Sequence, residues 1–305
     1  MTAPVRIVEV APRDGLQNEP TRLTTEQKRR LVEHAVRFGA RNIEVTSFVH
    51  PAKVPAMADA EDLVAMLPPA DGVTYSALIL NERGLSRALA AGITEVNVVV
   101  HCTDTFSRRN QGTDIAGGIG IWRRIARDAE AAGIRANVTL AVAFGCPFEG
   151  EVPVEAVRSV AEQVLQERPP AELSLADTIG VAVPRDVAAR VEAVRDLLPE
   201  GTALRAHFHN TRNCGIANAL AAIDAGVGVL DASLGGIGGC PFAPRATGNI
   251  ATEDLAYALE RSGIDHGLDT AALREAGRWL QEQIGRPLPA MVLHAGGFPT
   301  GDAAA

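Results

Sequence analysis

Two histidines separated by a single residue are the clearest chemical signal in the sequence. His207 and His209 follow residues 202–205, whose composition predicts a β-strand. Side chains at positions i and i+2 of a strand point to the same face, so the two imidazoles should project together. Such a pair can hold a divalent metal if a carboxylate arrives from elsewhere, whereas two unrelated surface histidines are the alternative.

The elements that must position these histidines alternate regularly along the chain. Apolar β-type segments are predicted at 5–10, 42–47, 73–78, 95–100, 135–144, 172–175, 202–209 and 228–232. Helical periodicity follows each of them, at about 25–38, 57–67, 83–91, 119–132, 154–167, 184–198, 213–225 and 251–262. A polar loop is expected at 101–114, and an extra helix at 271–284.

Eight strand–helix units predict an α/β protein with the (β/α)₈ TIM-barrel fold. An open doubly wound sheet is the alternative, but it usually carries a glycine-rich turn after its first strand. Here that turn contains Pro12, Arg13 and Asp14 instead. We expect one domain over residues 1–305, with the barrel at about 5–262 and a C-terminal helix and tail at 263–305.

A TIM barrel carries its active site at the C-terminal ends of the strands. The ionisable and polar residues that the sequence places there, besides the two histidines, are Arg13, Asp14, Glu44, Asp177, Cys240 and Asn249. Glu44 taken alone is better explained as a solvated loop charge or as part of a salt bridge at the barrel mouth. Asp14 and the two histidines converge from the first and seventh strands, which predicts a metal or catalytic centre.

Composition excludes several classes of function. The 305 residues carry a net charge of -8 without a run of Lys or Arg, which argues against nucleic-acid or membrane-surface binding. Hydrophobic residues make up 47% of the chain and aromatic residues only 4%, so the core should be aliphatic. No apolar run reaches transmembrane length, and no secretory signal is recognised. Four widely spaced cysteines suggest free thiols in a reducing cytoplasm.

Six segments of the chain resemble the 3-hydroxy-3-methylglutaryl-CoA lyases, which are members of the DRE-TIM metallolyases. The similar segments are residues 8–19, 46–51, 54–59, 145–150, 174–180 and 235–255, so they spread over nearly the whole chain. This resemblance implies a carbon–carbon lyase that releases acetyl-CoA and a keto acid from a 3-hydroxyacyl-CoA. It further implies a small-molecule acyl-CoA substrate, a role in leucine catabolism and a homo-oligomer, either a dimer or a tetramer.

The resemblance also assigns roles to individual residues. It implies Mg²⁺ or Mn²⁺ as the metal, although the ligand types alone would also admit Zn²⁺ or Fe²⁺. It implies that Arg13 stabilises an enolate and that Cys240 acts as an acid or base, although an isolated cysteine is more often a small buried apolar residue. The implied metal ligands are Asp14, His207, His209 and Asn249. The implied catalytic and supporting residues also include Glu44, Asp177, His207, Gln17 and Glu253.

Some positions depart from the lyase pattern. Asn210 stands where the lyases usually have Asp, and this form resembles the condensing branch of the superfamily. His101 and Arg245 stand where the lyases more often have small residues. These positions border the substrate pocket, so the sequence does not determine which acyl group the substrate carries. The basic residues that could meet CoA phosphates are Lys53, Arg108, Arg109 and Arg245, and solvated loop charges are an equal alternative. A Claisen-condensing synthase and a non-catalytic metal- or CoA-binding barrel are the alternative functions.

Overall fold

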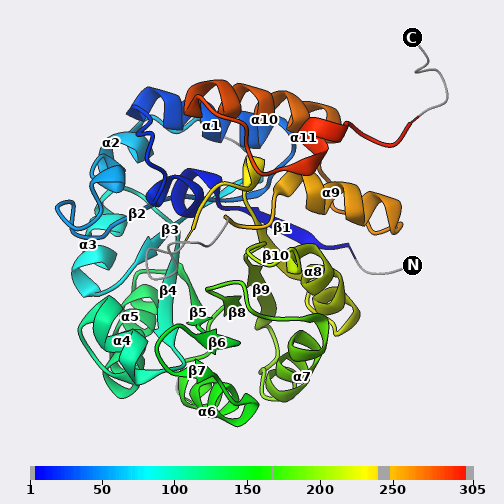
Figure 1. Ribbon diagram of the computed structural model, residues 1–305. Helices are drawn as coiled ribbons and strands as arrows, with labels where there is room; N and C mark the ends of the chain where they lie inside the picture. Colours follow the sequence, from blue (N-terminus) through cyan, green and yellow to red (C-terminus); the bar gives the residue numbers. More distant parts are fainter. Residues whose placement is uncertain (1–3, 70, 167, 240–247, 300–305) are drawn as a thin grey trace.

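Eight parallel strands close into a barrel in the computed structural model, which describes residues 4–69, 71–166, 168–239 and 248–299. Around the barrel each strand pairs in parallel with its neighbours, and β1 pairs with both β2 and β10 (Figure 1). The predicted TIM-barrel fold is therefore confirmed. The barrel strands are β1 (Arg6–Glu9), β2 (Asn42–Ser47), β3 (Thr74–Ile79), β4 (Glu95–His101), β5 (Arg135–Ala141), β8 (Glu172–Asp177), β9 (Ala203–Phe208) and β10 (Val229–Ala232).

A ring of helices surrounds the barrel. In α1, Thr24 forms a capping box with Gln27, and Leu31, Val32 and Ala35 form the buried face. The helices that follow the barrel strands are α1 (Thr25–Arg37), α2 (Ala60–Ala65), α3 (Glu82–Ala90), α5 (Ile115–Ala131), α6 (Val154–Leu165), α7 (Pro184–Arg195), α8 (Gly215–Asp224) and α9 (Thr252–Arg261). The helical spacing of apolar residues therefore predicted this layer correctly.

Two C-terminal helices lie against this ring. The extra helix expected from the sequence is α10 (Thr270–Ile284), which packs on α1 and α9 (Figure 1). Trp279 of α10 lies 4.7 Å, between ring centroids, from His34 of α1. The short helix α11 (Met291–Ala295) was not expected. The chain thus continues from the barrel into a segment that covers the outside of the first and last units.

Two local features differ from the expectations. The predicted loop at 101–114 contains helix α4 (Asp104–Gln111), in which Phe106 and Ser107 are the buried residues. The fifth strand was predicted to reach residue 144 but ends at Ala141, because Val142 has a left-handed φ of 52°. After it, β6 (Gly145–Cys146) and β7 (Gly150–Glu151) form a small antiparallel hairpin.

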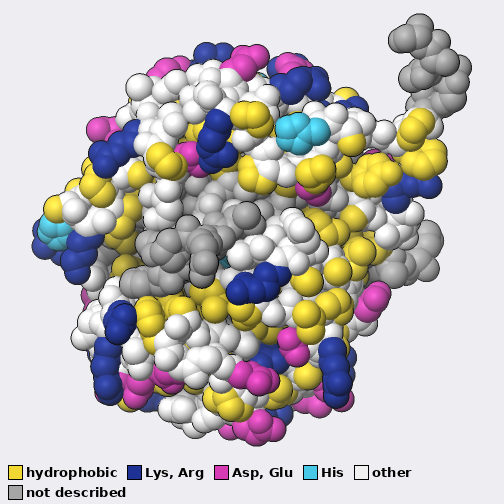
Figure 2. Space-filling model, in the orientation of Figure 1, with side chains coloured by type: hydrophobic (Ala, Val, Ile, Leu, Met, Phe, Trp, Pro, Cys, Tyr) yellow, Lys and Arg dark blue, Asp and Glu magenta, His cyan; other side chains and the backbone are white. Residues whose placement is uncertain are grey.

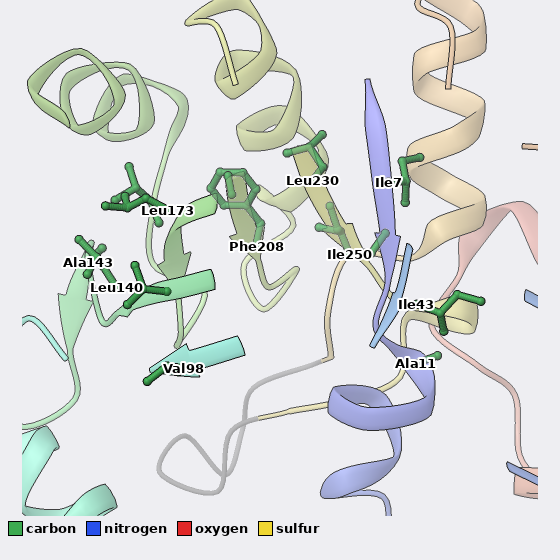
Figure 3. Packing of buried hydrophobic residues seen from close by; sticks show 14 of the residues in the cluster. Ile7, Ala11, Ile43, Val98, Leu140, Ala143, Leu173, Phe208, Leu230 and Ile250 are labelled. Atoms are coloured by element: carbon green, nitrogen blue, oxygen red, sulfur yellow. The ribbon is translucent and has the colours of Figure 1, made fainter. Parts of the chain in front are cut away.

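The barrel has an apolar outside and a largely polar inside. Strand residues that face the helices belong to one aliphatic core, which includes Val98, Leu140 and Leu173 (Figure 3). The alternate residues of each strand point into the barrel. On β4 the inward residues that line the cavity are Asn97, Val99 and His101. Deeper inside, buried Glu95, Asn97, Asn137, Glu172 and Arg205 form hydrogen bonds and ion pairs. Among the described residues, no helix is both long and apolar enough to cross a membrane.

Candidate active site

A cavity of about 950 Å³ lies at the C-terminal ends of the barrel strands. Figure 2 shows the molecule in the orientation of Figure 1, with Lys and Arg side chains (dark blue) scattered over the visible face. The cavity has a polar wall that combines residues from many segments of the chain. The lining residues used below are Arg13, Asp14, Gln17, Glu44, Lys53, Arg83, Asn97, His101, Arg205, His207, His209 and Asp231.

The two histidines lie together, as the strand spacing predicted. Their ring centroids are 4.9 Å apart, and both side chains are largely buried. The Nδ1 of His207 lies 2.9 Å from Oδ2 of Asp231, and the Nδ1 of His209 lies 3.0 Å from the carbonyl oxygen of Asp177. In each ring Nδ1 is therefore engaged by an acceptor, which leaves Nε2 as the nitrogen available to a metal.

A short helical turn delivers the carboxylate. The segment η1 (Ala11–Gly15) follows β1 directly and carries Arg13 and Asp14. A Cβ atom on Gly15 would lie 2.7 Å from Ile237, so only glycine allows this turn to pack against the segment after β10. Asp14 Oδ2 lies 3.9 Å from His207 Nε2. The potential ligand atoms of Asp14, His207 and His209 all lie within 4.8 Å of one another.

Arg13 bridges two carboxylates at the edge of this group. Its Nε donates to Glu44 Oε2, and its Nη1 donates to Asp14 Oδ1 at 2.5 Å. The other oxygen of Glu44 accepts from Asn97 Nδ2 at 2.6 Å. Of the two alternatives for Glu44, a solvated loop charge or a salt bridge, the structure shows the salt bridge, which also fixes the direction of the Arg13 guanidinium at the cavity wall.

Asn249 reaches the site by pairing with the end of β9. It forms an antiparallel bridge with His209, and Asn210 N donates to Gly248 O at 3.1 Å. The Nδ2 of Asn249 donates to Asp14 Oδ2 at 2.8 Å and to Ile237 O at 3.2 Å. Its Oδ1 is buried without a hydrogen-bond partner in the described part of the chain.

Burial and neighbouring charges shift the pKa values of the three ionisable groups. Burial alone would raise the pKa of Asp14, but Arg13 and the two imidazoles outweigh it and hold that pKa well below its usual range. Burial lowers the pKa of His209 to about 4, and the neighbouring His207 adds to this effect. For His207, the hydrogen bond to Asp231 and the charge of Asp14 overcome burial and raise the pKa.

The residues present fit a divalent cation. One ionised carboxylate and two Nε2 atoms converge, and the orphaned Oδ1 of Asn249 supplies a fourth potential ligand beside them. Oxygen and imidazole donors in this combination suit Mn²⁺ and Mg²⁺ as well as Zn²⁺. A buried amide oxygen without a partner is costly unless something else satisfies it, and a cation would do so.

Several predicted site residues lie elsewhere. The Asp177 carboxylate accepts from the backbone N–H groups of Val181 and Ala182, at 2.9 and 3.0 Å, and does not line the cavity. Glu253 is also outside the cavity, and both its oxygens accept from Gly235 N, at 2.8 and 3.0 Å. Gln17 does line the cavity, and its Oε1 is buried without a partner among the described residues.

The basic residues proposed for CoA divide into two groups. Lys53 is exposed and lines the cavity. Arg108 and Arg109 do not line it, because Arg108 faces Asp104 at 3.4 Å and Arg109 lies over the Phe148 ring. Cys240 and Arg245 lie outside the described residues.

Sequence reasoning missed two residues at the floor of the cavity. Asp231 and Arg205 are buried there and contact each other, and Asp231 also contacts His207. Arg205 shares a strand face with His207 and His209, so the alternation that predicted the histidine pair also carried this signal. Asp231 gave no comparable signal, because it lies inside an apolar strand without a motif.

A parallel eight-stranded barrel with a carboxylate, two imidazoles and a guanidinium at its strand ends defines the class, which is a TIM barrel with a candidate metal centre. The chain belongs to the HMGL-like family, whose pattern it matches over residues 4–280. The relatives that it resembles at about 40% identity are named as carbon–carbon lyases.

Two similar proteins have been assigned activities on different thioesters. The chain is 42% identical to hydroxymethylglutaryl-CoA lyase YngG of Bacillus subtilis over 93% of its length and 95% of that protein. It is 43% identical to (R)-citramalyl-CoA lyase of Chloroflexus aurantiacus over 96% of its length and 95% of that protein. A solved HMG-CoA lyase from Acinetobacter baumannii, in complex with coenzyme A and 3-methylmalate, superimposes with a TM-score of 0.93 and is 37% identical. That comparison covers 100% of this chain and 99% of the solved one.

Proposed function

We propose that this protein is a divalent-metal-dependent lyase that cleaves 3-hydroxy-3-methylglutaryl-CoA, or a closely related 3-hydroxyacyl-CoA, to acetyl-CoA and a keto acid. The observation that carries the proposal is the convergence of Asp14, His207 and His209 beside Arg13 at the wall of one large cavity. Membership of the HMGL-like family and the names of the relatives support the same reaction.

The metal site consists of Asp14, His207, His209 and Asn249 in this proposal, with Mg²⁺ or Mn²⁺ as the ion. When bound, such a cation supplies Lewis-acid chemistry that lowers the pKa of a substrate hydroxyl. The protein contributes ligands that are already oriented, because Nδ1 of each imidazole is held by an acceptor of the barrel. Asp14 is kept ionised by Arg13 and can therefore act as a ligand at neutral pH.

Arg13 has the second role, which is to stabilise the negative charge of the departing enolate. Cleavage removes the hydroxyl proton and breaks a C–C bond. The electron pair of that C–C bond stays on the thioester fragment, which becomes the enolate. The Nε and Nη1 atoms of Arg13 are occupied by Glu44 and Asp14, so the guanidinium is fixed before substrate arrives. A preoriented donor of this kind stabilises charge more effectively than mobile water does.

A proton donor must then convert the enolate into acetyl-CoA. We assign this step to Cys240. Of the other two candidates for proton transfer, His207 has both ring nitrogens committed, to Asp231 and to the metal site. Glu44, Gln17 and Glu253 act as supporting residues. The engagement of the Asp177 carboxylate by two backbone N–H groups favours a role in shaping the turn after β8 over direct proton transfer.

The CoA moiety would enter through the mouth of the cavity. Lys53 and Arg83 are exposed cations that line it, and they are the candidates for phosphate contacts, whereas Arg108 and Arg109 contact other side chains. We further propose that residues 1–305 form one domain, a homo-oligomer in solution and a cytoplasmic enzyme of leucine catabolism. The free thiols of Cys102, Cys146 and Cys214 support a reducing compartment.

Activity with metal and two thioesters tests the proposal. The protein is stripped with a chelator, supplied with Mg²⁺ or Mn²⁺, and given 3-hydroxy-3-methylglutaryl-CoA or citramalyl-CoA. Acetoacetate from the first or pyruvate from the second identifies the acyl group, and both names occur among the similar proteins. Failure to release any keto acid from either thioester would refute the lyase assignment.

A matched pair of variants tests the metal site. Asp14→Asn should weaken Mn²⁺ binding by roughly 10–100-fold or more in calorimetry and abolish cleavage. The control is Asp59→Asn, which removes a carboxylate that pairs with Lys28 outside the cavity. Equal Mn²⁺ affinity in Asp14→Asn and the control would remove Asp14 from the ligand set.

A further inference from the structure

Asp231 lies inside the barrel, directly beside His207. It belongs to β10, which neighbours β9, and Val229 pairs in register with Arg205 (Figure 1). Continuing two residues along both strands brings Asp231 to His207, and its Oδ2 lies 2.9 Å from His207 Nδ1. The exposed fraction of Asp231 is 6%, so water does not compete strongly for this carboxylate.

The second oxygen of Asp231 has a separate partner. Arg205 Nε and Nη2 both donate to Oδ1, at 2.6 and 2.5 Å. Arg205 is itself held from the other side, because its Nη1 donates to Glu172 Oε2 at 3.1 Å. Each oxygen of Asp231 therefore faces one neighbour, and the carboxylate has little freedom to rotate.

Stability alone does not explain why these charges are buried. Burying an ion pair costs desolvation, and an apolar replacement of similar size is often as stable or more stable. A buried carboxylate that accepts Nδ1–H does have a specific effect on a histidine. It fixes the tautomer and the ring orientation, and it leaves the Nε2 lone pair free for a ligand.

We propose that Asp231, anchored by Arg205, is the positioning residue of the metal site, because it holds His207 with the proton on Nδ1 and Nε2 facing Asp14. The inference deepens the proposed function and rests on its metal site. Asp231 does not bind the metal in this proposal, since its Oδ2 contacts Nδ1 of His207, on the side of the ring away from the Nε2 that faces Asp14.

The isosteric variant Asp231→Asn gives a sharp test. Arg205 presents two donors, so the amide should turn its oxygen toward Arg205 and its NH₂ group toward His207. Nδ1 would then have to accept, and the proton would move to Nε2, the atom that faces Asp14. A comparable exchange in a catalytic triad preserves the geometry but imposes the wrong tautomer.

Long-range ¹H–¹⁵N NMR of the metal-free protein reads the tautomer directly, at a pH at which the imidazoles are neutral. His207 should carry its proton on Nδ1 in the wild type and on Nε2 in Asp231→Asn. Calorimetry should show Mn²⁺ affinity reduced by roughly 10–100-fold in the variant. The matched control is Glu95→Gln, an acid-to-amide change of another buried residue in the barrel, which contacts Asn137 and Arg135.

A proton on Nε2 of wild-type His207 would overturn the inference, and so would wild-type Mn²⁺ affinity in a folded Asp231→Asn protein. If that variant does not fold, the wild-type spectrum still decides. The two proposals fail differently. A wild-type protein that binds no Mn²⁺ and cleaves no thioester refutes the proposed function, whereas one that does both with the opposite tautomer refutes only the role of Asp231.

Discussion

Arg13 is the residue on which the proposed chemistry depends most directly. Its two carboxylate partners, Glu44 and Asp14, come from different segments and hold the guanidinium from two sides. Glu44 is in turn held by Asn97. The orientation of Arg13 is therefore a property of the barrel and not of the substrate, as expected for a group that must stabilise charge at the moment it develops.

The variant Arg13→Gln should lower kcat by roughly 10²-fold or more, because one preoriented donor to the enolate is lost. Binding of Mn²⁺ should persist, since Arg13 is not a ligand. Steady-state kinetics and calorimetry measure the two effects, with the exposed Arg108→Gln as control. If kcat fell less than about tenfold while KM rose, Arg13 would instead bind the ground state of the substrate.

At this scale the sequence predicted some residues of the site and not others. Strand alternation and the position of strand ends were enough to predict that Asp14, His207 and His209 meet, because both rules are local. The partners of those residues depend on which strands become neighbours when the barrel closes. Asp231 therefore gave no signal until the register of β9 with β10 was known, and Asn97 none until the registers of β2 with β3 and of β3 with β4 were known.

Two described residues that follow β10, Gly238 and Asn249, meet at the metal site. Gly238 has a φ of 125°, and a Cβ atom there would lie 2.5 Å from Asn249 Nδ2. No other residue type combines this backbone with this approach. The position of Asn249 thus depends on a glycine that itself carries no chemistry.

The variant Gly238→Ala should therefore displace Asn249 and weaken Mn²⁺ binding, together with a fall in kcat. Gly228→Ala is a suitable control, because its Cβ atom would meet nothing within 4 Å. Calorimetric titration of both proteins measures the effect. Equal affinities would mean that Asn249 does not contribute to the metal site or that the backbone at Gly238 adjusts without cost.

Glu253 anchors the short helix η3 (Leu234–Gly236) through Gly235 N, and its burial makes this anchor sensitive to pH. Burial raises the pKa of Glu253 to about 8, although the backbone hydrogen bonds to it act in the opposite direction. An unfolded glutamate titrates near about 4.3. Between these values the folded protein binds more protons than the unfolded one, so this group makes stability fall as pH rises.

The variant Glu253→Gln removes that titration and keeps an acceptor for Gly235. The Tm of the variant minus the Tm of the wild type should be larger at pH 9 than at pH 5. Each kcal/mol of difference in the free energy of unfolding corresponds to about 2–4 °C. Calorimetric scans at the two pH values measure this difference, and the exposed Glu260→Gln in the same helix is the control. A Tm difference that is independent of pH would show that Glu253 stays ionised in the folded protein.

Other elements show where local patterns stop being informative. The helix α4 was predicted as a loop because its composition is polar and only Phe106 and Ser107 are buried. Strand β5 was predicted too long because the run of apolar residues continues beyond Ala141. The left-handed φ of Val142 ends the strand. A β-branched residue favours extended backbone, so the sequence does not predict this conformation.

The whole molecule was the most predictable level. Eight alternating units and short connections leave few topologies, and the barrel is one that closes all of its strand edges. The extra helix α10 was predicted because its apolar spacing is regular, whereas the five residues of α11 are too few to show a period. The function followed from six motifs spread over the chain and from the family match.

The direction of the reaction belongs to this scale. Asn210 resembles the condensing branch of the superfamily, but the chain covers 95% of the length of two relatives that are named lyases. We expect no comparable rate of condensation between acetyl-CoA and 2-keto acids. Release of free CoA, followed with a thiol reagent, measures that reaction. Steady release without cleavage of any 3-hydroxyacyl-CoA would reverse the assignment and identify a synthase.

The polar interior of the barrel has a calorimetric consequence. Unfolding would expose the carboxylate of Glu172, which pairs with Arg6 and Arg205, and the amide of Asn137, along with the aliphatic core. Exposed apolar surface increases the heat capacity of unfolding, whereas exposed polar surface decreases it. A barrel filled with charges should therefore have a flatter curve of stability against temperature than one of equal size filled with aliphatic side chains. The interior that orients the site also makes the protein less sensitive to cold.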